Sequence, residues 1–223
     1  LSGSPVRFNK MSLLDKNNLL ATSKDYGVWF YNLQTHLIRP WHTSTNKIMA
    51  SFADTNGRLY LSYYKEGLYC FSANGKELFH LTTANSNLTN NIILDITYHN
   101  NKLWLGTDGG GISILDPSNP RQITNLQHRP GDSGSLPNNS IKVLYTDMNQ
   151  NIWAGTVRGG MFGIHEVPIR TYKDVPLLNT KGLSEKVVIS LFEDQNGILW
   201  IGTDGGGINQ YNPSSDRFLH YPT

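Results

Sequence analysis

The sequence predicts an all-β fold of repeated four-stranded units, and an internal repeat is the main evidence for it. The segment LWLGTDGGGI at Leu103–Ile112 returns almost unchanged as LWIGTDGGGI at Leu199–Ile208. Weaker copies give a series of equivalent marker positions, spaced 40 to 49 residues apart: Leu20, Tyr60, Trp104, Trp153 and Trp200. The 21 glycines and 11% aromatic residues also suit strands joined by tight turns. Short strands that recur at this period are typical of β-propeller blades.

Each copy begins with an alternating or apolar run that predicts an inner strand, at Phe8–Leu14, Lys47–Ala53, Ile92–Tyr98, Ile141–Thr146 and Val187–Glu193. Polar turns rich in Asn, Asp and Gly follow, because these residues tolerate positive φ. They begin at Asp15, Asp54, His99, Asp147 and Asp194. The second strand carries the marker position.

A glycine link leads into the third strand, as in Gly111–Pro117 and Gly207–Pro213. Outer fourth strands are expected at Gln122–Gln127, Ile169–Tyr172 and Arg217–Tyr221. We therefore expect residues 1–223 to form a single propeller domain of about five blades, with repeats at about 6–39, 46–80, 91–127, 140–172 and 186–221. These blades are either part of a seven-bladed propeller or a five-bladed ring.

The marker and the repeated glycine both have structural explanations. A large aromatic side chain at a fixed strand position is expected to pack between adjacent blades, and its replacement by Leu20 or Tyr60 suits a packing role. The glycine recurs at one position in every copy, as Gly27, Gly67, Gly111, Gly160 and Gly207, which predicts a turn with positive φ. A phosphate-binding loop would need a helix after it, and here another strand follows.

Charge and hydropathy exclude several partners. The net charge is +2, and the 19 Lys and Arg residues are scattered, so no nucleic acid is expected to bind. The sequence holds no window of 18 apolar residues, so this segment is not expected to contact a membrane. The first ten residues lack an apolar stretch of the signal-peptide type, which places any targeting segment outside this chain.

The residues that usually carry metal or thiol chemistry show no suitable pattern. Cys70 is the only cysteine, so an intrachain disulfide is impossible, and we expect it to be a small apolar residue on a strand. The seven histidines lack the spacing of metal ligands, and the Asp-x-Asn-Gly turns at Asp54 and Asp194 lack the length and helices of an EF-hand. No metal and no cofactor are predicted.

Two segments carry a resemblance to a known family. Ser135–Ile164 and Leu183–Tyr221 follow the pattern Ser-Leu-x-x-Asn-x-Val, an apolar strand, Asp-x-x-Gly, then Leu-Trp-Ile-Gly-Thr, two variable positions and Gly-Gly-Leu/Ile. This pattern resembles the two-component regulator propeller repeat. The third, fourth and fifth copies match well, whereas the first two are degenerate.

The resemblance implies a function. In that family the repeats form the periplasmic sensor half of hybrid two-component proteins, followed by a β-sandwich, a transmembrane helix and a histidine kinase. Many members are linked to oligosaccharide sensing and to the control of polysaccharide-utilisation genes. By this resemblance the chain is a non-enzymatic, periplasmic part of such a sensor, which binds an oligosaccharide or another small ligand and forms a homodimer in the full-length protein.

Specificity is expected where the repeats differ, on the link between the second and third strands. The two variable positions and their neighbours contain charges suited to sugar hydroxyls, uronates or sulfates, and aromatic rings suited to stacking. The predicted ligand-binding residues are Arg158, Asp108, Asp204, Tyr64, Lys65, Asp25 and Tyr26, with Lys24 and Tyr63 as further candidates. Arg158 is the leading one, because it places a fixed charge beside two glycines. The long links Arg129–Asn139 and Asp174–Glu185 are either further binding elements or ordinary connections between blades.

Two other function classes stay open. The chain is alternatively an interaction or dimerisation scaffold without a small ligand. A propeller lyase or glycoside hydrolase would need two carboxylates in a shared cleft, and Asp108 and Asp204 are the candidates for that pair. No catalytic motif supports the enzyme.

Overall fold

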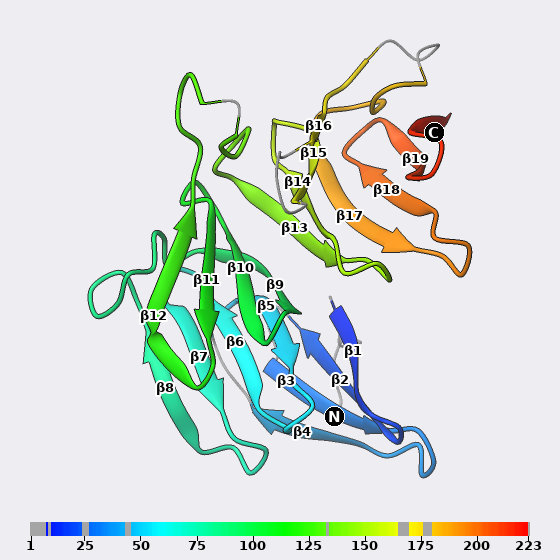
Figure 1. Cartoon of the computed structure of the whole chain (residues 1–223). Helices are drawn as coiled ribbons and strands as arrows, with labels where there is room; N and C mark the ends of the chain where they lie inside the picture. Colours follow the sequence, from blue (N-terminus) through cyan, green and yellow to red (C-terminus); the bar gives the residue numbers. More distant parts are fainter. Residues whose placement is uncertain are drawn as a thin grey trace. The chain divides into compact units, whose positions relative to one another are not determined.

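The computed structural model describes residues 8, 10–23, 27–42, 46–132, 134–164, 170–175 and 180–222. These residues form twenty strands and no helix, arranged as five four-stranded sheets. Every sheet is a meander in which consecutive strands pair antiparallel (Figure 1). The structure therefore confirms the predicted all-β propeller fold with five blades in this chain.

The blades follow one another along the chain and are numbered 1 to 5. Blade 1 contains β1 (Lys10–Asp15), β2 (Asn18–Ser23), β3 (Gly27–Asn32) and β4 (Ile38–His42). Blade 2 contains β5 (Ile48–Ala53), β6 (Leu59–Tyr63), β7 (Gly67–Phe71) and β8 (Glu77–Leu81). Blade 3 contains β9 (Ile93–His99), β10 (Lys102–Thr107), β11 (Ile112–Asp116) and β12 (Asn119–Leu126). Blade 4 contains β13 (Ile141–Thr146), β14 (Ile152–Thr156), β15 (Met161–Ile164) and β16 (Arg170–Tyr172). Blade 5 contains β17 (Val188–Glu193), β18 (Leu199–Thr203), β19 (Gly207–Asn212) and β20 (Arg217–Tyr221).

The strand boundaries differ slightly from the predicted ones. The first strand starts at Lys10 rather than Phe8, and the outer strand of blade 3 starts at Asn119, three residues before the predicted Gln122. Ile169, the predicted start of the outer strand of blade 4, lies outside the described residues. Strand ends at turns are weakly specified by sequence, because Asn, Asp and Pro there suit both a turn and a strand end.

The chain divides into two compact units, Leu1–Ile93 and Leu94–Thr223. The first unit contains blades 1 and 2, and the second contains blades 3, 4 and 5 apart from Ile93, the first residue of β9. Within each unit, apolar side chains of neighbouring blades form shared cores. One core joins blades 1 and 2 around Leu20, Val28 and Leu61. In the second unit, a core around Ile112 and Phe162 joins blades 3 and 4, and another around Trp153 and Tyr211 joins blades 4 and 5.

As predicted, marker side chains pack in the cores shared by adjacent blades at Leu20, Trp104 and Trp153. Trp200 instead stacks on Tyr221 of its own blade. Trp153 is only 2% exposed, and its ring lies 5.6 Å, centroid to centroid, from that of Tyr211 in blade 5. Its indole Nε1 also donates a 2.9 Å hydrogen bond to Asp147 in the preceding hairpin turn. The same bond joins Trp200 to Asp194 in blade 5, and the hydroxyl of Tyr60 donates to Asp54 in blade 2. The turn aspartate thus satisfies the polar atom of the interface ring.

The repeated glycines adopt the predicted positive φ. Their φ values lie between 75° and 88° at Gly27, Gly67, Gly111, Gly160 and Gly207. At Gly160 a Cβ would also stand 2.1 Å from the carbonyl oxygen of Tyr172, so a side chain there is excluded on both grounds.

Cys70 is the small buried strand residue that the sequence predicts. It lies on β7 with no exposed surface. Burial raises the pKa of its thiol to about 11, which keeps it protonated near neutral pH.

Candidate functional site

Arg158 lines a pocket of about 510 Å³ in the second unit. The pocket brings together three segments that are separated in sequence: the connection between blades 3 and 4, the β14–β15 link, and the end of blade 4. Its lining residues are His128, Asp132, Ser135, Leu136, Pro137, Asn138, Arg158, Gly159, Thr171, Lys173 and Asp174. This volume lies in the usual range for a small-molecule site. Both long links identified in the sequence contribute, the first through Asp132 and Ser135–Asn138 and the second through Asp174.

The connection between blades 3 and 4 is held in place by its own hydrogen bonds. The Ser135 hydroxyl shares its one proton between the carbonyl oxygens of Arg129 and Asp132, at 3.1 and 2.8 Å, and accepts from the Arg129 N–H at 2.9 Å. His128 Nδ1 donates to the Leu136 carbonyl at 2.6 Å. Leu136 itself is 1% exposed and anchors the segment in the core between blades 3 and 4. A loop fixed in this way is suited to present binding groups.

Two glycines let the Arg158 link lie against this connection. A Cβ on Gly159 would stand 2.9 Å from the Cβ of Asn138, so a side chain there would push the two segments apart. Gly160 supplies the positive φ that turns the chain into β15. Neither glycine position tolerates a side chain, and the exposed Arg158 side chain next to them lines the pocket.

The lining of the pocket carries two cations and two carboxylates, and one of the carboxylates is already paired with a residue outside the lining. Arg158 and Lys173 are exposed cations, and Asp174 is an exposed carboxylate. Asp132, the other carboxylate, is paired with Arg129 at 2.8 Å. Ser135, Asn138 and Thr171 add hydroxyl and amide groups to the lining. A guanidinium and an ammonium among such groups can bind sugar hydroxyls together with a carboxylate or sulfate.

The two predicted aspartates of this unit lie elsewhere. Asp108 accepts a hydrogen bond from Ser140 Oγ and forms an isolated β-bridge with the same residue, so its carboxylate ties blade 3 to the start of blade 4. Asp204 is exposed, and its backbone N–H donates to the Val187 carbonyl at 3.0 Å. Neither lines the Arg158 pocket.

The predicted residues of the first unit fall into three groups. Tyr64 and Lys65 are exposed side by side, with Lys65 Nζ 5.1 Å from the Tyr64 ring centroid. Lys24, Asp25 and Tyr26 lie outside the described residues. Tyr63 was a wrong candidate for sugar stacking: it is 4% exposed, and its ring packs edge-on against Tyr69 at 5.3 Å in the core between blades 1 and 2.

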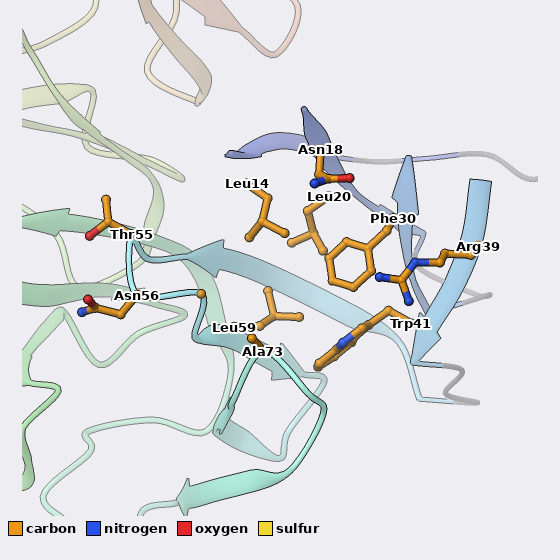
Figure 2. A pocket seen from close by; sticks show the side chains of 11 residues that line it. Leu14, Asn18, Leu20, Phe30, Arg39, Trp41, Thr55, Asn56, Leu59 and Ala73 are labelled. Carbon is orange, nitrogen blue, oxygen red and sulfur yellow. The ribbon is translucent and has the colours of Figure 1, made fainter. Parts of the chain in front are cut away.

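A second pocket, of about 440 Å³, lies between blades 1 and 2 (Figure 2). Its lining includes Phe30, Arg39 and Trp41, none of which is a predicted ligand-binding residue. It lies at the end of the blades that carries the β1–β2 and β5–β6 turns, whereas the predicted residues lie on the β2–β3 type of link. The sequence feature that indicates this pocket is Leu20, a smaller side chain at the marker position where other blades have Trp.

A metal centre and a membrane-spanning helix each have requirements that can be compared with the part of the chain that the structure describes. No group of three or more His, Cys, Asp or Glu side chains there is placed to hold a metal ion. The same residues contain no helix of the length and hydropathy needed to cross a bilayer.

Solved structures with this fold include an extracellular domain of a two-component system and an inactivated lyase. The extracellular domain of a hybrid two-component system from B. thetaiotaomicron superposes with a TM-score of 0.76 at 21% identity, covering 94% of this chain and 28% of that one. A catalytically inactive virginiamycin B lyase from Staphylococcus aureus, solved with quinupristin, gives a TM-score of 0.68 at 13% identity, covering 96% of this chain and 69% of that one. At these identities the likeness establishes the fold alone.

Sequence comparison adds one distant relative and one family. An F-box protein from Arabidopsis thaliana is 28% identical over 170 residues, so that the match spans 70% of this chain and 42% of that protein. The profile of the two-component regulator propeller family matches residues 135–158 and 182–205. The first segment ends at Arg158 and contains the Ser135–Asn138 wall of the pocket. The resemblance seen in the sequence is thereby confirmed for these two segments, each of which matches one two-component regulator propeller repeat.

Proposed function

We propose that this chain is part of the extracytoplasmic sensor region of a hybrid two-component protein. Its ligand is an oligosaccharide, and the full-length protein is a periplasmic, inner-membrane homodimer that regulates polysaccharide-utilisation genes. The chain itself binds rather than catalyses, and the kinase lies elsewhere in the longer protein. Two family matches in the second unit support this role.

The Arg158 pocket is the binding site in this proposal, and its lining is the observation that carries it. A ligand rich in hydroxyl groups would find amide, hydroxyl and charged partners in the lining, from Asn138, Thr171 and Lys173. Arg158 would pair with a uronate or sulfate group of the sugar, because its planar guanidinium matches such anions in two parallel hydrogen bonds.

Calorimetric titration with neutral and uronate-containing oligosaccharides tests the proposal. We expect saturable binding of at least one acidic oligosaccharide, weakened about tenfold or more in Arg158→Ala. Arg121→Ala is the matched control, since Arg121 is an exposed arginine on β12 that does not line the pocket. If the two variants bind the oligosaccharide with equal affinity, Arg158 does not contact the ligand and the binding site lies elsewhere.

The same titrations separate the two competing functions. If no oligosaccharide binds, the scaffold without a ligand becomes the better account, and the mass of the chain in solution would then show whether it self-associates. Cleavage of a bound oligosaccharide, seen by mass spectrometry, would instead favour the lyase or hydrolase and direct mutagenesis to Asp108 and Asp204.

A further inference from the structure

The pocket between blades 1 and 2 is lined by apolar side chains together with a few polar ones. Figure 2 shows Leu14, Leu20, Phe30, Leu59 and Trp41 around one space. Thr55 and Asn56, in the β5–β6 turn, lie on one side of it, and Arg39 of β4 lies on the other. The Phe30 and Trp41 rings meet edge to face, with centroids 5.9 Å apart.

This pocket has an origin in the repeat. Leu20 pairs with Phe30 across β2 and β3 as Trp153 pairs with Gly163 across β14 and β15, so the two residues hold the same marker position. Between blades 4 and 5 the indole of Trp153 fills the interface. Between blades 1 and 2 the smaller Leu20 stands in its place and itself lines the pocket. The space is therefore suited to a flat aromatic ring, such as the one that Trp153 supplies between blades 4 and 5.

The single charge in the lining of this pocket indicates which chemical group the ligand carries besides its ring. Arg39 is the only charged residue among the lining residues, and its guanidinium lies 4.9 Å from the Phe30 ring centroid. None of the ion pairs formed by described residues involves Arg39. A guanidinium held over an aromatic ring at the edge of an apolar pocket favours an anionic group attached to the ring that enters.

We propose that this pocket binds a small aromatic carboxylate. The ring lies beside Trp41 and Phe30, at the place that the marker tryptophan occupies in blade 4, and the carboxylate pairs with Arg39. This site is separate from the Arg158 pocket, lies in the other unit, and does not depend on the sensor role proposed above.

Indole-3-acetate and its neutral counterpart indole-3-acetamide are the probes, titrated by calorimetry and by NMR of the tryptophan indole N–H signals. We expect the anion to bind about tenfold tighter than the amide, with the largest shift at the Trp41 signal. Arg39→Gln should remove this preference. Arg217→Gln, at an exposed arginine on β20, should keep it.

Leu20→Trp is the second variant, because it would fill the pocket from within. It should abolish binding of both probes while keeping or raising the thermal midpoint of unfolding. The proposal is overturned if neither probe shifts the Trp41 signal, if Arg39→Gln leaves the preference for the anion intact, or if folded Leu20→Trp still binds. Since Arg39 is exposed, its variant folds and keeps the test decisive even if Leu20→Trp does not.

Discussion

The interface between blades 4 and 5 and the one between blades 1 and 2 use the same repeat position in opposite ways. In the first, Trp153 is almost fully buried, bonded to Asp147 and packed on Tyr211. In the second, Leu20 is equally buried but smaller, and a pocket of about 440 Å³ lies beside it. The backbone of the repeat is thus the same at both interfaces. The volume of the side chain at the marker position decides whether the interface is filled or contains a pocket.

The position after the repeated glycine gives a second comparison. Val28, Leu68, Ile112 and Met161 have no exposed surface, whereas Ile208 of blade 5 is 49% exposed. Phe192 and Tyr221 of the same blade are also largely exposed. The same sequence position is therefore a core residue in four blades and a surface residue in the fifth, because burial depends on what packs against a blade rather than on the repeat itself.

Removing the marker ring should have the largest effect. Trp153→Ala is expected to lower the free energy of unfolding by about 3–5 kcal/mol, since it deletes a buried indole and leaves a cavity. Leu20→Ala should cost only about 2 kcal/mol, because the existing pocket already borders the deleted atoms. Urea unfolding of both variants measures the difference. Similar losses would contradict the view that only one of the two interfaces is filled.

A smaller difference in unfolding free energy is expected between Met161 and Ile208, which hold the same repeat position but differ in exposure. Met161→Ala should cost about 3 kcal/mol, and Ile208→Ala less than about 1.5 kcal/mol, because the second side chain removes little buried area. Thermal unfolding of the two variants provides the test. A large loss for Ile208→Ala would show that another surface covers blade 5 in solution.

A substitution in blade 3 is expected to raise the free energy of unfolding rather than lower it. His99 stands where blades 4 and 5 have the turn aspartate, and Trp104 Nε1 is buried without a hydrogen-bond partner among the described residues. His99→Asp is expected to supply that acceptor and to raise the free energy of unfolding by about 1 kcal/mol. His99→Ala is the control, since it removes the ring without adding an acceptor. If the two variants are equally stable, the acceptor does not reach Trp104.

The smallest expected effect is a pH dependence in blade 5. The hydrogen bond from Trp200 Nε1 lowers the pKa of Asp194 below its ordinary value of 3.8. The stability that this bond adds is therefore complete above that value and is lost as the pH falls through the lower pKa of the folded state. An NMR titration of the Asp194 carboxyl group should show its pKa moving up toward 3.8 in Trp200→Phe. An unchanged titration would assign the shift to the turn N–H groups of Asn196 and Ile198 instead.

The sequence by itself determined the blade count, the strand order and the structural role of the repeated residues. These features are local, because the strand-turn-strand period and the glycine with positive φ each lie within one repeat. Arg158 stood out for the same reason, as a charge beside two glycines that interrupts the pattern, and the structure places it at a pocket. Its role in binding stays a prediction.

The tertiary structure alone decided where pockets form and which equivalent residues are buried. The Arg158 pocket needs the connection at Ser135–Asn138 to lie against Gly159, and the other needs Leu20 and Trp41 to border the β5–β6 turn. Neither contact is a property of a single repeat. Tyr63 shows the same limit, since it follows the pattern of a surface link but packs in the core. Packing between blades depends on the volumes of side chains distant in sequence, and a repeat pattern read along one chain does not encode that match.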